Sequence, residues 1–320
     1  MRVIDDLARA HVAGETIVTI GSFDGLHIGH QQLVKQLVAH ARETRRESAL
    51  VTFHPHPRAV LRPWLSPKVL TTPGEKAALL AQWGLDILVL LRFTPALAHT
   101  PAADFMRLLY ERLHIAELWI GQDFALGRDR EGDAAALQKM GEQWGFQVHI
   151  VEPVVIDGRP VSSTWIRELL SAGQVAEARR LLGRPYSLAG EVVSGARRGR
   201  CLGFPTANLA VRPERALPPD GVYAVYAIVG DQPRPAVANI GERPSFNTGQ
   251  RAIEVHILDY QGNLYGQDLV VEFIQRLRSE QRFEDICELI RQIDRDIQHA
   301  RSIFAAEEER ISEERGERVP

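Results

Sequence analysis

The stretch TIVTIGSFDGLHIGHQQLVKQL, residues 16–37, determines how the first half of the chain folds. It opens with an apolar, β-branched run that predicts a buried strand ending at Gly21. Apolar residues then recur at i, i+4 spacing from Leu33 to Ala41, which predicts a helix over about residues 30–44 with one buried face. A strand followed directly by such a helix is the repeating unit of a parallel α/β sheet.

The same alternation of β-rich runs and helical patterns continues to residue 183. Strands are expected over residues 16–21, 49–53, 86–93, 116–121 and 146–151, and helices over residues 30–44, 74–84, 102–113, 134–145, 164–173 and 175–183. This pattern predicts a Rossmann-like α/β domain in which helices cover both faces of a parallel sheet. The break RPYSLAG follows, so we expect one domain over residues 1–183 and another over residues 184–320.

In the second half, β-rich runs are separated by glycine, proline and asparagine instead of by helices. Strands are expected over residues 188–195, 221–230, 234–241, 252–260 and 268–277. Such spacing predicts an antiparallel sheet or a small β-barrel. A long helix is expected over residues 283–306, and the charged tail after it is expected to fray.

Composition excludes several classes of function. The formal net charge of the 320 residues is −3, which gives no electrostatic reason to expect nucleic acid or an anionic membrane as a partner. The longest apolar run, ILVLL at residues 87–91, is too short to cross a bilayer, and the N-terminus lacks a signal-peptide core, so we expect a cytoplasmic protein. Cys201 and Cys287 have no metal or redox spacing and are interpreted as reduced thiols.

The turn between the first strand and its helix has the chemistry of a phosphate site. A helix start directs backbone N–H groups and the positive end of the helix dipole toward one point. His27 and His30 lie three residues apart there and can donate to phosphate oxygens, while Gly29 between them has no side chain to obstruct a triphosphate. The Walker and GxGxxG patterns are absent. The alternative is an ordinary strand-to-helix turn with two nearby histidines.

These residues also carry a family resemblance. GSFDGLHIGH, residues 21–30, resembles the signature of the HxGH nucleotidyltransferases, and its version with phenylalanine, aspartate and glycine is similar to the flavin adenylyltransferase half of bacterial bifunctional riboflavin kinase/FAD synthetases. TFHPHP at 52–57, GQDFALGRDREGD at 121–133 and VSSTWIREL at 161–169 match the same family in order. The resemblance covers most of the first 180 residues.

The resemblance implies an adenylyl transfer. His27 and His30 would hold the phosphates of ATP and stabilise charge at the α-phosphorus while FMN attacks and pyrophosphate leaves. This reaction needs positioning and well-placed donors, not a protein nucleophile. The other residues that the resemblance places at the nucleotide or the flavin are Gly21, Phe23, Asp24, Gly25, Gly29, His54, Pro55, Pro57, Asp123, Ser163, Thr164 and Arg167.

Two features of these motifs need separate interpretation. Where the family usually has an arginine after the aromatic residue of the third motif, this chain has Ala125 and Leu126, with Arg128 and Arg130 following closely. The HPHP run, added to the two motif histidines, raises the alternative of a metal site, but its prolines are more simply explained as stiffening a loop over the active site.

The second half has a motif of its own in GEVVSGARRGRCLGFPTANLAV, residues 190–211. A glycine- and arginine-rich turn suits a polyphosphate, and we expect Gly195, Gly203 and Pro205 at the nucleotide or the flavin. The hydroxyl of Thr206 and the amide oxygen of Asn208 are hard ligands that suit Mg²⁺. Strand alternation places these two side chains on the same face.

Six further segments in order resemble the riboflavin kinase domain across residues 184–295: GFPTANL, GVYAVY, VANIGERPSF, EVHILD, LYGQDLVVEF and LRSEQRF. The resemblance implies that Thr206 and Asn208 bind the magnesium of MgATP and that Glu254 is the general base for the riboflavin 5′-hydroxyl. Apolar neighbours place Glu254 on the polar face of its strand. That face is either the outside of a barrel or a mouth lined with ligand contacts.

Together these observations predict a flavin cofactor enzyme with two activities. The second domain would phosphorylate riboflavin to FMN, and the first would convert FMN to FAD, each with MgATP. One alternative keeps the HxGH chemistry but gives it a different phosphorylated acceptor. The other gives the barrel a binding role, for flavin or a protein partner, without catalysis.

Overall fold

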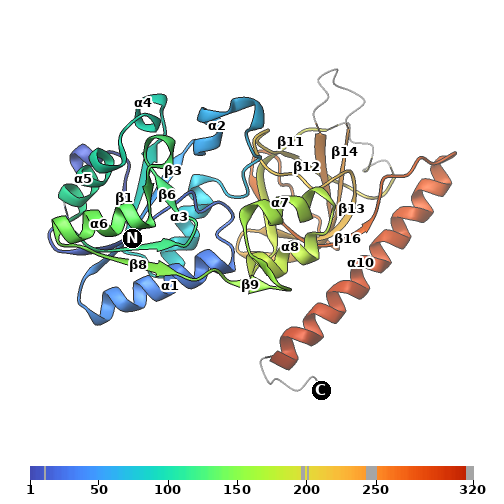
Figure 1. The fold of residues 1–320 in the computed structure, drawn as a ribbon. Helices are drawn as coiled ribbons and strands as arrows, with labels where there is room; N and C mark the ends of the chain where they lie inside the picture. The colour runs from blue at the N-terminus through green and yellow to red at the C-terminus, as the bar shows by residue number, and fades with distance from the viewer. Residues whose placement is uncertain (11, 196–198, 200–201, 243–250, 315–320) are drawn as a thin grey trace. The chain divides into compact units, whose positions relative to one another are not determined.

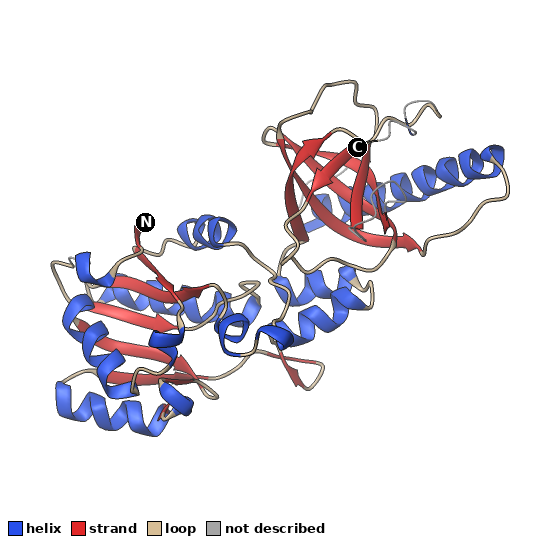
Figure 2. Cartoon of the chain, turned by 90° about the horizontal axis from the view of Figure 1, so that it is seen from above, coloured by secondary structure: helices blue, strands red, loops and turns tan. Residues whose placement is uncertain are grey.

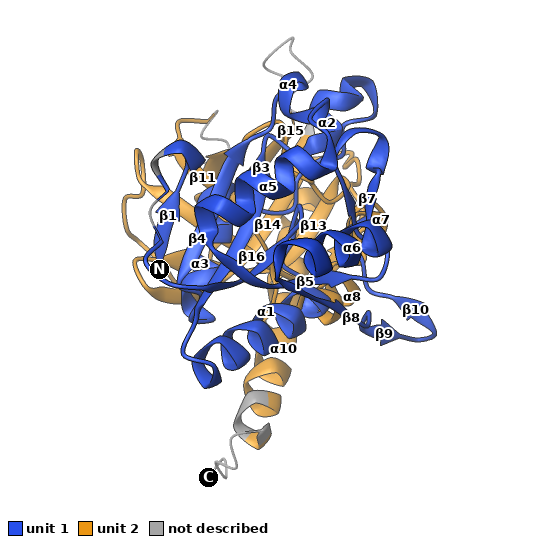
Figure 3. Cartoon of the chain, turned by 60° about the vertical axis from the view of Figure 1, so that its left-hand side comes forward, with its two compact units in different colours: residues 1–165 blue, residues 166–320 orange. Residues whose placement is uncertain are grey.

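The computed structural model (Figure 1) describes residues 1–10, 12–195, 199, 202–242 and 251–314. Strands gather in two places, a parallel sheet in the first half of the chain and a closed barrel in the second (Figure 2). The chain divides into two compact units, residues 1–165 and 166–320 (Figure 3). The predicted fold class is therefore confirmed for both halves.

The first unit is built on a sheet in the order β1-β4-β3-β2-β5-β8, in which all neighbouring strands are parallel. The strands are β1 (Arg2–Ile4), β2 (Thr16–Ile20), β3 (Glu47–His54), β4 (Ile87–Arg92), β5 (Ile115–Gly121) and β8 (Gln147–Val151). The main helices are α1 (Ile28–Glu43), α3 (Pro73–Gln82), α5 (Ala102–Leu113) and α6 (Ala134–Trp144). Short elements connect them: α2 (Pro57–Leu61), α4 (Pro95–Ala98), β6 (Ala125–Leu126), β7 (Gly132–Asp133), β9 (Val155–Ile156) and β10 (Arg159–Pro160).

Side chains alternate between the two faces of the sheet and contribute to a hydrophobic layer on each face. On one face, Ile17 and Leu50 of the sheet pack with Leu37 of α1 and Leu80 of α3. The other face packs against α5 and α6, with Met106 at its centre. Helices therefore cover both faces, as the alternating sequence pattern predicts.

Strand β2 is the point at which the strand order reverses. The chain proceeds from β2 through β3 to β4 on one side, and then to β5 and β8 on the other side of β2. In open α/β sheets, ligands bind outside the carboxyl ends of the strands at such a reversal. The turn after β2, residues 21–27, lies there.

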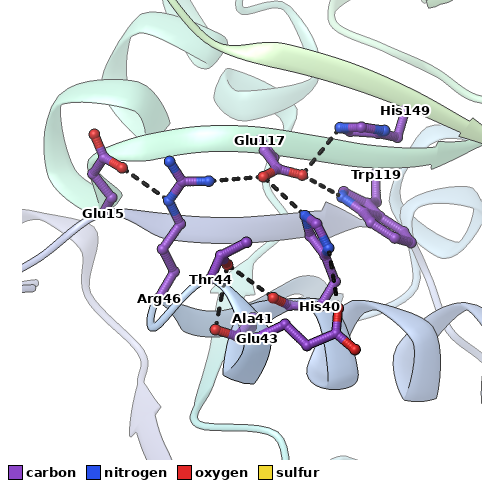
Figure 4. A network of polar contacts seen from close by, with 9 residues as sticks. All are labelled: Glu15, His40, Ala41, Glu43, Thr44, Arg46, Glu117, Trp119 and His149. Carbon is purple, nitrogen blue, oxygen red and sulfur yellow. Dashed lines mark hydrogen bonds and ion pairs between the residues drawn. The ribbon is translucent and has the colours of Figure 1, made fainter.

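Near the C-terminal end of α1, one buried carboxylate contacts side chains from several elements (Figure 4). Glu117 of β5 is 5% exposed, and its Oε1 accepts hydrogen bonds from Arg46 (2.8 Å) and His40 (3.1 Å). Its Oε2 accepts from Trp119 (3.1 Å) and lies 3.0 Å from Nε2 of His149. Burial acts to raise the pKa of Glu117, but the hydrogen bonds from Trp119 and His40 and the charges of His40 and His149 outweigh it. The pKa of Glu117 therefore lies below its ordinary value.

The second unit contains a closed barrel in the order β11-β12-β15-β14-β13-β16, with antiparallel pairing throughout. Its strands are β11 (Tyr186–Val193), β12 (Ala207–Ala210), β13 (Gly221–Val229), β14 (Gln232–Glu242), β15 (Arg251–Ile257) and β16 (Asp268–Arg278). The helix α10 (Ile286–Glu314) packs Ile297, Ala300 and Phe304 against the outer face of the barrel. Large apolar side chains such as Tyr223 and Phe273 are fully buried.

Two helices precede the barrel, α7 (Ser163–Ser171) and α8 (Val175–Leu182). Helix α8 packs against β11 and β16, and residues from 166 onward belong to the second unit for that reason. A domain boundary at residue 183 stays a prediction.

Several element bounds differ from the sequence expectations. Helix α1 begins at Ile28, two residues before the expected start, because His27 caps it. The expected helix over residues 283–306 begins at residue 286 and continues to residue 314, so the tail is helical for eight residues further than predicted. The glutamates and arginines there form ion pairs such as Arg310–Glu307, which support a helix on a polar surface. Strand β1 was not predicted, since three residues at a sheet edge give no periodic signal.

We predict that Glu117→Gln lowers the free energy of unfolding of the first unit at pH 7 by about 1–3 kcal/mol, because a buried charge-assisted acceptor is lost. The folded pKa of Glu117 lies below the unfolded value, so its contribution is present above the unfolded pKa and disappears as the pH falls through the folded pKa. The wild-type unit should therefore lose more stability than the variant as the pH falls below 4.5.

Urea unfolding followed by tryptophan fluorescence measures this effect, because all five tryptophans lie within residues 1–165. Glu15→Gln is the matched control: Glu15 also accepts from Arg46, but its side chain is 63% exposed, so we expect a loss of less than about 1 kcal/mol. Equal effects of the two substitutions would contradict the role assigned to Glu117.

Candidate functional site

The turn over residues 21–27 carries the first candidate site. Phe23, Gly25 and Leu26 all have positive φ, at 44°, 80° and 45°. Non-glycine residues adopt this conformation only where their surroundings hold them in it. Here the side chains of Phe23 and Leu26 are anchors, because both are buried in the core layer beneath α1.

Asp24 fixes this turn from the other side. Its carboxylate is 3% exposed and accepts hydrogen bonds from the backbone N–H groups of Leu70 (3.0 Å) and Thr71 (3.1 Å). The hydroxyl of Thr71 accepts from the N–H of Gly25 at 3.0 Å, so each segment holds the other. The structure therefore places the Asp24 carboxylate in the framework of the turn, and its predicted contact with a ligand stays a prediction.

The two imidazoles of the HxGH motif lie together at the start of α1. His27 is the N-cap residue, and its Nδ1 accepts from the N–H of His30 at 3.4 Å. The two rings are stacked with centroids 3.6 Å apart, and the ring of Phe23 lies 5.0 Å from that of His30. Because Nδ1 of His27 accepts a hydrogen bond, a neutral His27 carries its proton on Nε2. Nε2 is then an N–H donor, and the predicted contact of His27 with a phosphate stays a prediction.

Two glycines of the motif are explained by packing against these rings. A Cβ on Gly29 would lie 3.2 Å from Cε1 and Nδ1 of His27. A Cβ on Gly21 would lie 3.0 Å from the ring of Phe23. The glycines allow the aromatic side chains to approach the backbone closely, in addition to the ligand access predicted from the sequence.

The HPHP segment follows the carboxyl end of β3, which neighbours β2. His54 is the last residue of β3, and Pro57 is the first residue of α2. His56 between them caps α2, with Nδ1 accepting from the N–H of Arg58 at 3.1 Å. Within the described ranges, no group of three or more histidine, cysteine, aspartate or glutamate side chains is arranged to hold a metal ion. Pro55 and Pro57 thus lie at the edge of the sheet where the turn lies.

The third motif follows the carboxyl end of β5, on the other side of β2. Asp123 is exposed there, and Nη2 of Arg130 donates to its backbone carbonyl oxygen at 2.9 Å. Leu126, at the position of the family departure, is buried in the core layer against α5. Arg130 therefore supplies a guanidinium group beside Asp123 in a chain that lacks the usual arginine.

The fourth motif reaches the turn through Ser163, whose hydroxyl donates to the carbonyl oxygen of Asp24 at 2.8 Å. Thr164 follows it on α7 and is exposed. Arg167 lies one turn further along this helix and belongs to the second unit, so its predicted contact with the nucleotide stays a prediction. Within the first unit, residues from all four motifs thus lie at one edge of the sheet.

The second candidate site lies on the outside of the barrel. Glu254 pairs with Asn208 of β12 on one side and with Asn239 of β14 on the other, so the three side chains form a row on one face. The intervening residues Ile253 and Val255 are 1% exposed and point into the barrel. The polar side chains of β15 therefore lie on the outer face of the barrel, and their predicted contact with a ligand stays a prediction.

Gly195, which precedes β12 in the chain, lies against Asn208 of this row. Asn208 is 5% exposed, and a Cβ on Gly195 would lie 2.4 Å from its Nδ2, so only glycine permits this close approach. Gly203 has a φ of 90°, which also favours glycine. The arginine-rich part of the loop before β12, residues 196–198 and 200–201, lies outside the described residues, as do residues 243–246 of the predicted VANIGERPSF segment.

An open cavity of about 510 Å³ lies at the inward-facing side of these strands, opposite the row. Pro205 and Thr206 line it, together with the inward-facing Val255 and with Tyr260 and Tyr265 of the loop between β15 and β16. Asn208 and Glu254 are not among its lining residues. The cavity has the size of a small-molecule site, and Thr206, one of the two predicted metal ligands, is among its lining residues.

Sequence reasoning missed three residues at these sites. His256 donates from Nδ1 to the carbonyl oxygen of Pro205 at 2.9 Å and fixes the start of β12. Asn239 enters the outer row only through strand pairing. Lys76 is buried behind the turn over residues 21–27. Asn239 and His256 could be found only from the strand register, which the sequence does not specify. Lys76 could not be found from the sequence, because its pattern is that of an ordinary helical lysine.

The fold and the two sites define the class of protein, a transferase of two domains that uses nucleotides. A family model described as FAD synthetase matches residues 10–165, and one described as riboflavin kinase matches residues 182–304. No helix in the described part of the chain has the length and apolar character needed to cross a membrane.

Relatives match nearly the whole chain. The bifunctional riboflavin kinase/FMN adenylyltransferase of Escherichia coli K12 is 38% identical over 306 residues, which is 95% of this chain and 97% of that protein. The protein of the same name from Pseudomonas fluorescens is 40% identical over 291 residues, or 90% and 93% of the two chains. A solved structure named as a macrolide-efflux protein from Streptococcus pneumoniae has 30% identity and a TM-score of 0.86, covering 94% of this chain and 98% of its own.

The chain therefore belongs to the family of bifunctional riboflavin kinase/FMN adenylyltransferases and is an enzyme with a domain of each kind. The recognition made from the sequence motifs is confirmed. The alternatives of an unrelated acceptor and of a barrel without catalysis are not favoured by these matches.

We predict that Gly29→Ala reduces adenylyl transfer by roughly threefold to tenfold, because the added methyl group displaces the ring of His27 by a few tenths of an ångström. Alanine favours a helix more than glycine does, so tryptophan-detected unfolding should show no loss of stability. Gly74→Ala, in the first turn of α3 with no atom within 4 Å of its added methyl group, is the matched control and should leave activity unchanged. FAD formation from FMN and ATP measures the effect. Equal activities of the two variants would contradict the packing role.

Proposed function

We propose that the second unit phosphorylates riboflavin to FMN with ATP, and that the first unit transfers AMP from a second ATP to FMN, which yields FAD and pyrophosphate. The substrates are ATP, riboflavin and FMN. We propose a cytoplasmic location, without nucleic acid or a membrane as partner, on the basis of the net charge of −3 and the short apolar runs.

For adenylyl transfer, the observation that carries the proposal is the stacked pair His27 and His30 at the start of α1. A phosphate oxygen of FMN attacks the α-phosphorus of ATP, the bond to the bridging oxygen breaks, and pyrophosphate leaves with the electron pair. Negative charge grows on the nonbridging oxygens and on the leaving group. Imidazole donors and the N-terminal dipole of α1 stabilise this charge without a protein nucleophile.

We predict that His30→Ala lowers the rate of FAD and pyrophosphate formation from ATP and FMN by about 10²-fold or more, the usual cost of removing one preorganised donor. Phosphorylation of riboflavin by the same preparation should be unchanged and serves as the internal control. His99→Ala, an exposed histidine on the loop after α4, is the matched control for loss of an imidazole. Full adenylyl transfer by His30→Ala would remove His30 from the site.

For phosphoryl transfer, the carrying observation is the pairing of Asn208 with Glu254 on adjacent strands. Directly opposed residues have Cβ atoms about 4.5–5.5 Å apart, so an oxygen ligand and a candidate base are neighbours. The amide oxygen of Asn208 and the hydroxyl of Thr206 are hard oxygen donors that fit Mg²⁺. When bound with ATP, the ion would neutralise phosphate charge.

In this proposal the Glu254 carboxylate accepts the proton of the riboflavin 5′-hydroxyl. The oxygen of that hydroxyl then forms a bond to the γ-phosphorus, and ADP leaves. Asn208 and Asn239 lie directly opposite Glu254 on its two neighbouring strands. The cavity lined by Thr206 and Tyr260, on the other face of β15 from Glu254, provides space and apolar surface for a substrate.

We predict that Glu254→Gln lowers kcat for FMN formation by about 10²–10⁴-fold, the usual contribution of a positioned base. FAD formation from supplied FMN should continue at the wild-type rate. Chromatographic separation of riboflavin, FMN and FAD after incubation with MgATP measures both reactions. Loss of both activities in equal proportion would contradict the assignment of Glu254 to one of them.

A further inference from the structure

Lys76 lies inside the first unit, where lysine is rarely found. It belongs to the first turns of α3, which Thr72 caps together with Glu75. Only 6% of Lys76 is exposed, and its ammonium group points toward the carboxyl ends of β2 and β3. The turn over residues 21–27 begins at that edge of the sheet.

The ammonium group completes a triangle of polar atoms at the start of this turn. Nζ of Lys76 donates to the carbonyl oxygen of Ser22 at 2.6 Å and to Oγ1 of Thr52 at 3.2 Å. The hydroxyl of Thr52 donates to the same carbonyl oxygen at 3.0 Å. One backbone carbonyl of the turn is therefore held from helix α3 and from strand β3 together.

The charged and titratable groups around Lys76 come from two further segments. Asp24, buried in the turn, faces it and attracts the ammonium charge. His54 and His56, at the end of β3, line the same small cavity of about 20 Å³ together with Lys76 and Asp24. The ammonium group thus lies next to both polar anchors of the turn, the Ser22 carbonyl and the Asp24 carboxylate.

The fold holds this charge at a cost. Burial lowers the pKa of Lys76 from 10.5 to about 8, although the charge of Asp24 acts in the opposite direction. The folded state therefore binds the proton less tightly than the unfolded chain does. Stability of the unit should rise as the pH increases from about 8 toward 10.5, where only the unfolded chain remains protonated. A charge that stabilised the fold would show the opposite trend.

We propose that Lys76 is a positioning residue for adenylyl transfer, which holds the turn over residues 21–27 through the Ser22 carbonyl and the Asp24 carboxylate and so fixes the imidazoles that follow. The proposal rests on the assignment of His27 and His30 to the adenylyl-transfer site. Lys76 touches neither imidazole, and it acts through the backbone that leads to them.

Lys76→Met is a clean test, because the other contacts of the turn remain. The Ser22 carbonyl keeps the hydroxyl of Thr52, and the Asp24 carboxylate keeps the N–H groups of Leu70 and Thr71. No buried polar group loses its last partner. Methionine also matches the length of the lysine stem and packs well in irregular apolar space.

We expect Lys76→Met to lower kcat for FAD formation from ATP and FMN at least tenfold, while riboflavin phosphorylation by the same molecule stays within twofold. Tryptophan-detected thermal unfolding of the first unit should occur at the same or a higher temperature than in the wild type. Lys139→Met, at an exposed position on α6, controls for loss of a lysine and should change neither activity.

The pH dependence separates positioning by the ammonium group from simple packing. The advantage of the wild type over Lys76→Met in FAD formation should shrink as the pH rises through about 8, because neutral Lys76 loses its attraction to Asp24. Over the same range the wild-type unit becomes more stable. Thr52→Val, which leaves the ammonium group in place, should lower FAD formation less and keep the alkaline decline.

Three results would overturn the proposal. If Lys76→Met formed FAD at the wild-type rate, the turn would not need the ammonium group. A lower unfolding temperature, or failure of this variant to fold, would show that Lys76 stabilises the fold. If the ratio of the wild-type rate of FAD formation to the Lys76→Met rate did not change with pH, the charge of Lys76 would have no part in positioning the turn. His30→Ala measured in parallel distinguishes the two assignments. Full activity of His30→Ala would contradict the assignment of the imidazoles and with it the role of Lys76, whereas low activity of His30→Ala with full activity of Lys76→Met would contradict the role of Lys76 alone.

Discussion

The buried carboxylate of Asp24, bound to the N–H groups of Leu70 and Thr71, is the interaction on which the first site depends. Between β2 and α1 the chain must reverse within residues 21–27, and it does so with Phe23 and Leu26 in left-handed conformations. Each such residue costs about 1 kcal/mol or more, so the turn persists only because its surroundings fix it. In the proposed reaction, a preformed turn would allow the imidazoles to stabilise charge without reorganising.

The side chains of the candidate site on the barrel are held in place by a different constraint. This site is fixed by strand register, which sets Asn208 and Asn239 on either side of Glu254, and not by a strained turn. Inward-facing Ile253 and Val255 hold that register, because a slip by one residue would bury the carboxylate and expose the apolar side chains. The two sites therefore depend on separate cores, which is why one activity can serve as an internal control for the other.

The sequence predicted the fold because hydrophobic periodicity and glycine breaks carry most of the relevant information. It also predicted that the HxGH histidines lie together at a helix start, because their spacing and position are local properties. It could not distinguish a ligand contact from a framework contact: Asp24 lies inside a binding motif, yet its partners are Leu70 and Thr71, more than forty positions away. Lys76 was missed for the same physical reason, since its burial and its bond to Ser22 arise only when α3 packs against the sheet.

The central claim is that the preformed turn presents the two imidazoles to the phosphates of ATP. A crystal structure of the full chain with a non-hydrolysable ATP analogue, magnesium and FMN tests it most directly. The account predicts phosphate oxygens within hydrogen-bonding distance of Nε2 of both His27 and His30, with the Asp24 carboxylate still bound to Leu70 and Thr71. Phosphates bound elsewhere in the first unit, or an Asp24 carboxylate released from that segment to contact the ligand, would contradict it.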